Sequence, residues 1–191
     1  MAPPVVAQQP AFLTNGLVAY YPFNGNANDE ISVANNFDKS PQFTSDRFGR
    51  LQNAADFLNS SPINSGVLPV KTHTVTVSFW LNIVRAPSYH GERVILHGSH
   101  NVGVGDQKAA TFGFAIWPDG RPDGVGVSFL KSDLTGGRIG LPSGTLSLNK
   151  WCHIAVTSAG GFVGLYIDGV LAAEEAGQFV DKNISTSVAN G

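Results

Sequence analysis

The run from Trp151 to Ala173, WCHIAVTSAGGFVGLYIDGVLAA, constrains the fold of this chain more than any other feature. On both sides of its Gly-Gly pair, residues alternate with the period of two that is typical of a half-buried β-strand. If Ser158 to Gly161 form a four-residue hairpin loop, Thr157 pairs with Phe162. One face of the predicted hairpin is then wholly apolar, with Cys152, Ile154, Val156, Val163, Leu165 and Ile167. A one-residue slip would expose this face, so the run predicts an antiparallel hairpin whose register is specified by the core.

Turn signals and alternation predict the other strands. Asp168-Gly169 is a two-residue type I′ turn signal, which returns the chain through Val170 and Leu171 as a third antiparallel strand. On the non-core face of the hairpin, His153 is expected opposite Tyr166. Residues 73–84 form the longest alternating run and predict a central strand with one face in the core. Other strands are expected at 16–23, 54–58, 93–97, 111–117 and 125–130, loops or connections at 59–66, 97–106 and 131–149, and no clear strand at 180–191.

The composition agrees with one large all-β domain. The 191 residues are 14% charged and include 22 Gly and 11 Pro, which indicates short strands joined by turn-rich loops. A net charge of −2 with mixed signs does not indicate the basic surface that binds nucleic acid. No apolar run is long enough for membrane insertion. The single cysteine, Cys152, excludes an internal disulfide and is expected to be a buried, inert thiol.

Four segments, in order, resemble one family. They are GLVAYYPFNGNANDE from Gly16, SDRFG from Ser45, VTVSFWLNI from Val75, and NKWCHIAVT followed by GLYIDG near the end of the chain. These segments are similar to laminin-G-like domains of the bacterial secreted type, in the concanavalin A-like lectin/glucanase superfamily. The resemblance implies an all-β fold, a concanavalin A-like jelly-roll sandwich of two antiparallel sheets, which the strand pattern also predicts.

Composition, length and the resemblance together predict how the chain is organised. Met1 to Thr14, rich in Pro, Ala and Gln, is expected to be a flexible linker behind a removed leader, so the protein is expected to be secreted or at the cell surface. Residues 15–191 are expected to form a single domain. Family members usually end with a strand carrying an Asp-Asp-aliphatic-Arg-aliphatic motif beside the first strand, and this sequence lacks that motif. A domain without that strand would present an unpaired edge, through which two copies could form a homodimer.

A calcium site is predicted in the segment after the first expected strand. Asn24, Asn26 and Asp29 belong to a run of Asx residues around Gly25, and hard cations accept such oxygen ligands. The alternative is an Asx-rich turn that holds no ion. The resemblance adds weight to a structural Ca²⁺, because such domains often bind calcium through this loop, with Asp29 and backbone carbonyls near Asn24 and Asn26 as ligands.

No catalytic motif is found. Glucanases of the superfamily carry Glu-x-Asp-x-x-Glu on one strand, and this sequence has no such run. Glu174 and Glu175 are adjacent and would point to opposite faces of a strand. The lyase-type Gln-x-His strand is also missing. His97 and His100, with His90 nearby, are more typical of solvated loop residues than of a zinc site. We therefore expect a protein that is not an enzyme, although it could be attached to one.

The remaining interpretation is a recognition module that binds a glycan or polysaccharide. Aromatic side chains stack on sugar rings, and amides, carboxylates, Arg or His bind hydroxyl or anionic groups. The non-core face of the long strand offers Trp80 and Asn82, whereas the loops offer the residues that we expect to bind ligand, namely Tyr89, His90, His100, Asn101, Trp117, Asp119 and Arg121. The alternatives are a module that binds a surface protein or acts as a structural spacer, and a divergent polysaccharide hydrolase or lyase.

Overall fold

The computed structural model describes residues 15–33, 36–57, 63–68, 74–85, 93–100, 109–116, 125–130, 136–142, 144–177 and 184–188. Strands are the regular elements of this part of the chain: β1 (Gln42–Thr44), β2 (Ala54–Asp56), β3 (Ile63–Leu68), β4 (Val75–Asn82), β5 (Arg93–His100), β6 (Ala109–Ile116), β7 (Val125–Leu130), β8 (Gly136–Leu141), β9 (Trp151–Ala159), β10 (Phe162–Ile167), β11 (Val170–Ala176) and β12 (Ile184–Val188). In these ranges no helix is long and apolar enough to cross a membrane.

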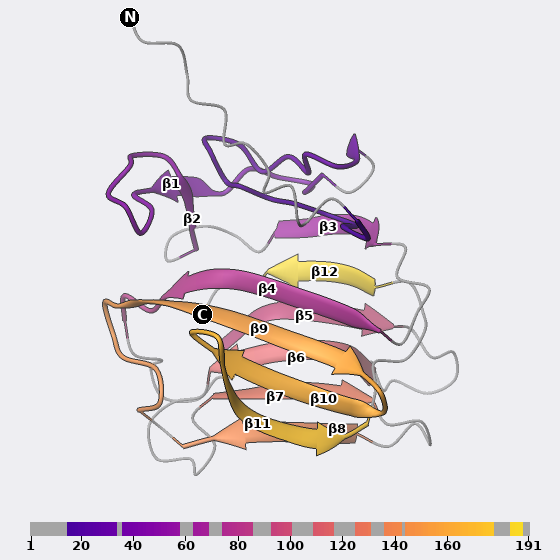
Figure 1. Cartoon of the computed structure of the whole chain (residues 1–191). Coiled ribbons are helices and arrows are strands. Elements are labelled where there is room, and N and C mark those ends of the chain that lie inside the picture. The colour runs from indigo at the N-terminus through magenta and orange to yellow at the C-terminus, as the bar shows by residue number, and fades with distance from the viewer. Residues whose placement is uncertain are drawn as a thin grey trace, which may run out of the picture.

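Ten of the strands form two sheets that face each other, and β1 and β2 form a separate two-stranded sheet. One sheet has four strands in the order β11-β10-β9-β4, and the other has six in the order β3-β12-β5-β6-β7-β8. The strand pairs of both sheets are antiparallel. Figure 1 shows the four-stranded sheet in front of the six-stranded one, and β11 packs against β8 at one side. The predicted all-β sandwich of two antiparallel sheets is confirmed.

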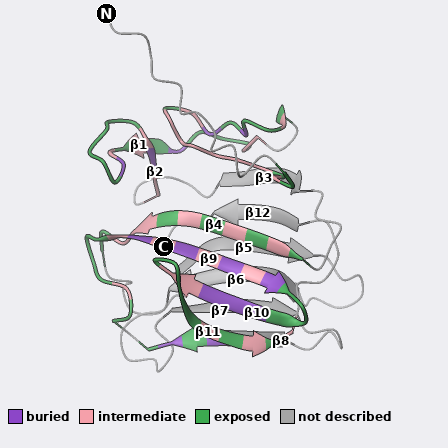
Figure 2. Ribbon diagram, viewed as in Figure 1, coloured by how far each residue is buried: buried purple, intermediate pink, exposed green. Residues whose placement is uncertain are grey.

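The core lies between the sheets, and the buried residues described in it come from β8, β9 and β10. They are Ile139, Leu141, Cys152, Ile154, Val156, Val163 and Leu165. Alternate residues of β4, from Val75 to Leu81, pack against them. Figure 2 shows this alternation as bands of buried and less buried residues along β9. The apolar face predicted for the hairpin is therefore the core face, and Cys152 is buried as expected.

The register of the β9–β10 hairpin differs from the predicted one by two residues. Phe162 pairs with Ala159, not with Thr157, so the loop is the pair Gly160-Gly161. Both glycines have positive φ, 59° and 82°, which a two-residue type I′ turn requires. A shift of two residues keeps every side chain on its face, and the predicted faces therefore survive the error. The predicted Asp168-Gly169 turn is confirmed, with φ of 49° and 82°.

Several predicted boundaries were wrong. Residues 16–23 are not a strand: Phe23 has a positive φ of 52°, and the backbone of Tyr20 is bonded to Asp29 and Glu30. Three stretches expected to lack strands contain β3, β8 and β12, whose Gly, Ser and Asn residues hide the strand pattern. The strand predicted at 93–97 continues to His100, so residues 97–100 belong to β5 and not to a loop.

Residues 15–33 and 36–57, here called the N-terminal layer, lie beyond the edge of the sandwich in Figure 1. The layer contains the β1–β2 hairpin, in which Gln42 pairs with Asp56. It also has an aromatic cluster of its own. The ring centroid of Tyr21 lies 4.6 Å from that of Phe37, and Phe23 contacts both Phe37 and Phe57. The layer is therefore packed around aromatic rings, whereas the buried residues described in the sandwich core are aliphatic residues and one cysteine.

Candidate functional site

The predicted calcium segment forms a turn held by its own side chains. Asn26 Nδ2 donates a hydrogen bond to Asn24 Oδ1 at 2.9 Å, and the Asn28 N–H donates to Asn26 Oδ1 at 2.9 Å. Gly25 supplies the positive φ of 89° at the bend. These bonds are typical of an Asx turn, in which the side-chain oxygens bind nearby N–H groups.

Asp29 joins this turn to the rest of the N-terminal layer. The residue is only 4% exposed, and its Oδ1 accepts hydrogen bonds from the N–H groups of Tyr20, at 2.8 Å, and Ile31, at 3.0 Å. The Asp29 N–H donates to Asn36 Oδ1 at 2.7 Å. Among the residues described, no three His, Cys, Asp or Glu side chains gather where they could hold an ion. The structure gives Asp29 a structural role, and the calcium site at Asn24, Asn26 and Asp29 stays a prediction.

The predicted ligand-binding residues fall largely outside the described ranges. Tyr89, His90, Asn101, Trp117, Asp119 and Arg121 all lie there. His100 is the last residue of β5, where its backbone pairs with Ala109. Their role in ligand binding therefore stays a prediction.

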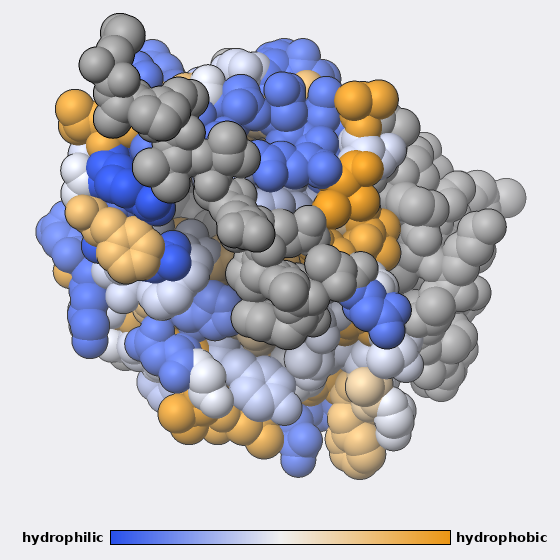
Figure 3. All heavy atoms as spheres, turned by 45° about the horizontal axis from the view of Figure 1, so that its top comes forward, coloured by the Kyte–Doolittle hydropathy of each residue, from blue (hydrophilic) through white to orange (hydrophobic). Residues whose placement is uncertain are grey.

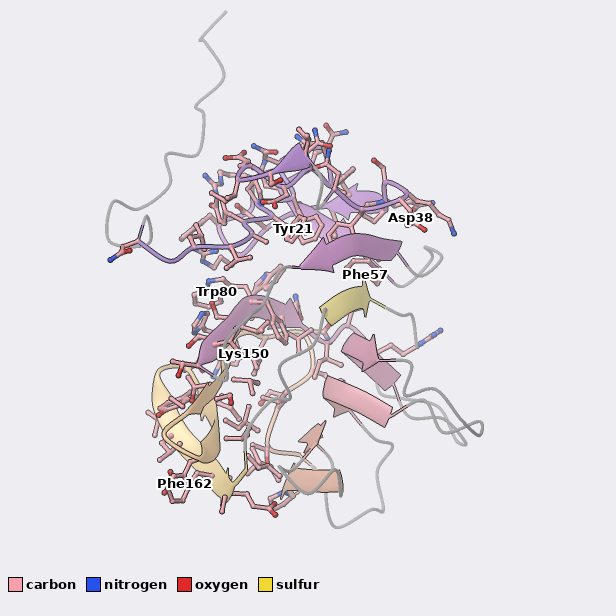
Figure 4. All side chains as sticks on the ribbon, turned by 90° about the vertical axis from the view of Figure 1, so that its right-hand side faces the viewer. Tyr21, Asp38, Phe57, Trp80, Lys150 and Phe162 are labelled. Atoms are coloured by element: carbon pink, nitrogen blue, oxygen red, sulfur yellow. The ribbon has the colours of Figure 1, made fainter. Side chains whose placement is uncertain are left out.

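The structure instead brings aromatic and cationic side chains together on the outer face of the four-stranded sheet. Trp80 on β4 pairs with His153 on β9, and their ring centroids are 5.2 Å apart with an interplanar angle of 53°. Their neighbours Phe79 and Ile154 point to the opposite face, toward the core. Trp80 is 44% exposed. Figure 4 places it where the sheet meets the N-terminal layer.

The layer contributes two more side chains to this surface. The Cζ atom of Arg47 lies over both the Phe48 ring and the Trp80 ring, 4.3 Å from each centroid. Such stacking is the usual geometry of a cation–π contact. Phe48 itself is 65% exposed. We call Arg47, Phe48, Trp80 and His153 the Trp80 platform.

Asp46 shapes the loop that carries Arg47 and Phe48. Its Oδ1 accepts hydrogen bonds from the N–H groups of Phe48 and Arg50, each at 2.9 Å, and its Oδ2 accepts one from Arg50 Nε at 2.7 Å. Arg50 Nη2 completes a salt bridge at 2.6 Å. Burial raises the pKa of the Asp46 carboxyl, but the hydrogen bonds and charge of Arg50 and the N–H of Phe48 outweigh burial, so its pKa lies below the ordinary value. Asp46 is therefore held as an anion beneath the loop.

The charges around the platform are unevenly compensated. Arg50 is paired with Asp46, whereas Arg47 has no carboxylate partner among the described residues. Within the same residues, neither the Arg47 guanidinium nor the Trp80 indole N–H makes a hydrogen bond to the protein. At the other side of His153, Asp168 Oδ1 accepts a hydrogen bond from the His153 N–H at 2.8 Å. Figure 3 shows hydrophobic and strongly hydrophilic side chains side by side over the N-terminal layer.

Sequence reasoning identified only part of this platform. Trp80 was predicted on the non-core face, but Arg47, Phe48 and His153 were not predicted as site residues. His153 was expected opposite Tyr166, whereas Tyr166 pairs with Ala155. The signal that could have found Arg47 and Phe48 is the SDRFG segment, because its Asp46 can cap the N–H groups of a loop that presents the next two side chains.

Comparison with known proteins places these observations in a family. A laminin-G-type family model, described as the concanavalin A-like lectin/glucanase superfamily, matches residues 57–189. No curated protein sequence matches. Domain 4 of AbnA, an extracellular arabinanase from Geobacillus stearothermophilus solved with arabinotriose, is similar at a TM-score of 0.62 and 18% identity, over 91% of this chain and 83% of that one. A galectin of Caenorhabditis elegans is similar at a TM-score of 0.45 and 13% identity, over 71% and 87% of the two chains.

Proposed function

Because this chain belongs to the concanavalin A-like lectin/glucanase superfamily, we propose that it is a non-catalytic carbohydrate-binding module and that the Trp80 platform is part of its binding surface. The observation that carries the proposal is the exposed Trp80 ring on a solvent-facing sheet, beside polar groups that have no hydrogen bond to the described protein. An aromatic ring in this setting can stack on the C–H face of a sugar, while neighbouring N–H groups bind its hydroxyl oxygens. The arabinotriose complex of the Geobacillus domain, which shares the fold, adds support for a glycan ligand.

The non-catalytic part of the proposal rests on the environment of the acidic residues. Glycoside hydrolysis generally needs two carboxyl groups that face each other across the scissile bond. Asp46 is bound to Arg50, and Asp29 is bound to backbone N–H groups. Glu174 and Glu175 are neighbours on β11, where they pair with Gly164 and Val163 and so point to opposite faces. None of these four residues has the arrangement that hydrolysis requires.

The test is calorimetric titration with neutral and acidic oligosaccharides, for the wild-type protein and Trp80→Ala. We expect wild type to bind at least one glycan and Trp80→Ala to bind it roughly tenfold more weakly, because the stacking surface is removed. Phe162→Ala is the matched control. Phe162 is also an exposed aromatic residue, at 51%, and Figure 4 shows it far from Trp80 along the sheet.

Two outcomes would contradict the proposal. If no glycan bound, or if both alanine variants kept full affinity, the Trp80 platform would not be a sugar-binding surface. Release of reducing ends from a polysaccharide by the purified chain would contradict the non-catalytic role.

A further inference from the structure

We infer that the Trp80 platform selects sugars that carry an anionic group, and that Arg47 is the residue that binds this group. The inference rests on the proposed glycan-binding function and specifies the substrate class. The shared chemistry is a carboxylate or a sulfate attached to a sugar ring.

The position of Arg47 is the first argument. Its guanidinium carbon lies over the Phe48 and Trp80 rings, 4.3 Å from each centroid, and the residue is exposed. A guanidinium carries five N–H donors, and within the described residues none of those of Arg47 makes a hydrogen bond. They therefore remain open to a ligand beside Trp80. A planar fork of donors matches the two oxygens of a carboxylate.

The charge balance is the second argument. The two arginines of the loop differ, because Asp46 binds Arg50 through both a hydrogen bond and a salt bridge. Arg47 has only the aromatic contacts within the described part of the chain. It is thus a cation that the loop exposes without neutralising it. An anionic group on a ligand would neutralise the charge of Arg47 and accept hydrogen bonds from its N–H groups.

The platform is also asymmetric, which predicts the orientation of the ligand. Arg47 lies over the Trp80 ring, and His153 lies beside Trp80 on the next strand, with Asp168 bound to the His153 N–H. A sugar on the exposed part of Trp80 would place its anionic group toward Arg47, because Asp168, next to His153, would repel it. Its hydroxyl groups could donate hydrogen bonds toward Asp168.

The decisive experiment compares two ligands with the same sugar backbone. Oligogalacturonate carries one carboxylate per ring, and its methyl ester has the same rings without the charge. We expect wild type to bind the acid about fivefold more tightly than the ester at 50 mM NaCl. The preference should shrink at 500 mM NaCl, because the exposed ion pair is screened. A second comparison, of sulfated dextran with plain dextran, tests whether a sulfate group is preferred in the same way as a carboxylate.

Three variants assign the preference to Arg47. Arg47→Gln should bind acid and ester equally, while Arg47→Lys should keep part of the preference, because it retains the charge but loses the planar fork. Lys39→Gln is the charge-matched control and should behave as wild type. Lys39 is exposed and follows Asp38, which Figure 4 shows on the other side of the molecule from Trp80. A thermal melt of each variant checks that it is folded.

The outcomes separate this inference from the proposed function. Equal binding of acid and ester by wild type, for both the carboxylate and the sulfate pairs, would overturn the anionic preference. A preference that survives in folded Arg47→Gln would overturn the role of Arg47. In either case, weaker binding by Trp80→Ala would leave the glycan-binding function standing. Failure of all glycans to bind would overturn both.

Discussion

At the scale of single residues, Asp46 holds the loop that carries Arg47 and Phe48, two residues of the Trp80 platform, although Asp46 is not part of the platform. Its carboxylate accepts two backbone N–H bonds and holds Arg50. Asp46→Asn keeps one oxygen acceptor but loses the charge that binds Arg50. We expect the free energy of unfolding to fall by about 1 kcal/mol at pH 7, a modest value because Arg50 is largely exposed. Urea denaturation of both proteins measures it.

The same comparison should depend on pH. Because the pKa of Asp46 is lowered in the folded chain, the residue stabilises the fold at pH values above its unfolded pKa, near 3.8. That contribution is lost as the pH falls through the lower folded pKa. The difference between wild type and Asp46→Asn should therefore be constant near neutral pH and shrink below 3.8. A difference that grows in acid would show that Asp46 does not act as a bound carboxylate.

Asp29 offers a second test at this scale, because its structural and metal-binding roles make different predictions. Asp29→Ala removes the acceptor for the Tyr20 and Ile31 N–H groups, so it should lower stability by about 1–2 kcal/mol with EDTA present. If calcium also binds there, calcium should raise the melting temperature of wild type and not that of the variant. Asn28→Ala is the control, since Asn28 is exposed and neighbours the same turn. An unchanged melting temperature in wild type on adding calcium would contradict the calcium site.

At the scale of elements, the β9–β10 hairpin shows why faces are easier to predict than registers. Alternation fixed which residues of β9 and β10 face the core, but it is compatible with loops of two and of four residues. The choice depends on Gly160 and Gly161, which both adopt positive φ and make the shorter turn favourable. Strands β3, β8 and β12 were missed for a different reason. Their position in a sheet depends on partners distant in sequence, such as β12 between β3 and β5.

Gly164 on β10 provides a prediction about the packing of the outer face. A Cβ atom there would lie 3.1 Å from Thr157 Oγ1 and 3.2 Å from Tyr166 Cε2, so both side chains would have to move. We expect Gly164→Ala to lower the free energy of unfolding by about 1–2 kcal/mol. Adding Thr157→Ala removes the nearest obstacle and should recover part of the loss, as urea denaturation would show. If Gly164→Ala were as stable as wild type, the face would be loosely packed.

At the scale of the whole molecule, the two-layer sandwich was predictable because short alternating strands and turn signals leave few other architectures. The resemblance of four ordered segments supported the same fold. The Trp80 platform was not predictable in this way, because it joins a loop of the N-terminal layer to the middle of two strands. The Arg47 guanidinium carbon lies 4.3 Å from the Trp80 ring centroid, yet no local pattern connects β4 with the loop at residues 45–53.

The two halves of the platform therefore belong to different parts of the chain. Trp80 and His153 stand on the sandwich, within the region that matches the family model, whereas Arg47 and Phe48 come from the layer that precedes it. Substitutions in the loop can change what the surface presents without changing residues of the sandwich core. Ligand preference can then diverge among related modules at little cost to folding. A library of variants that differ only in this loop could therefore be screened for binding to a new glycan.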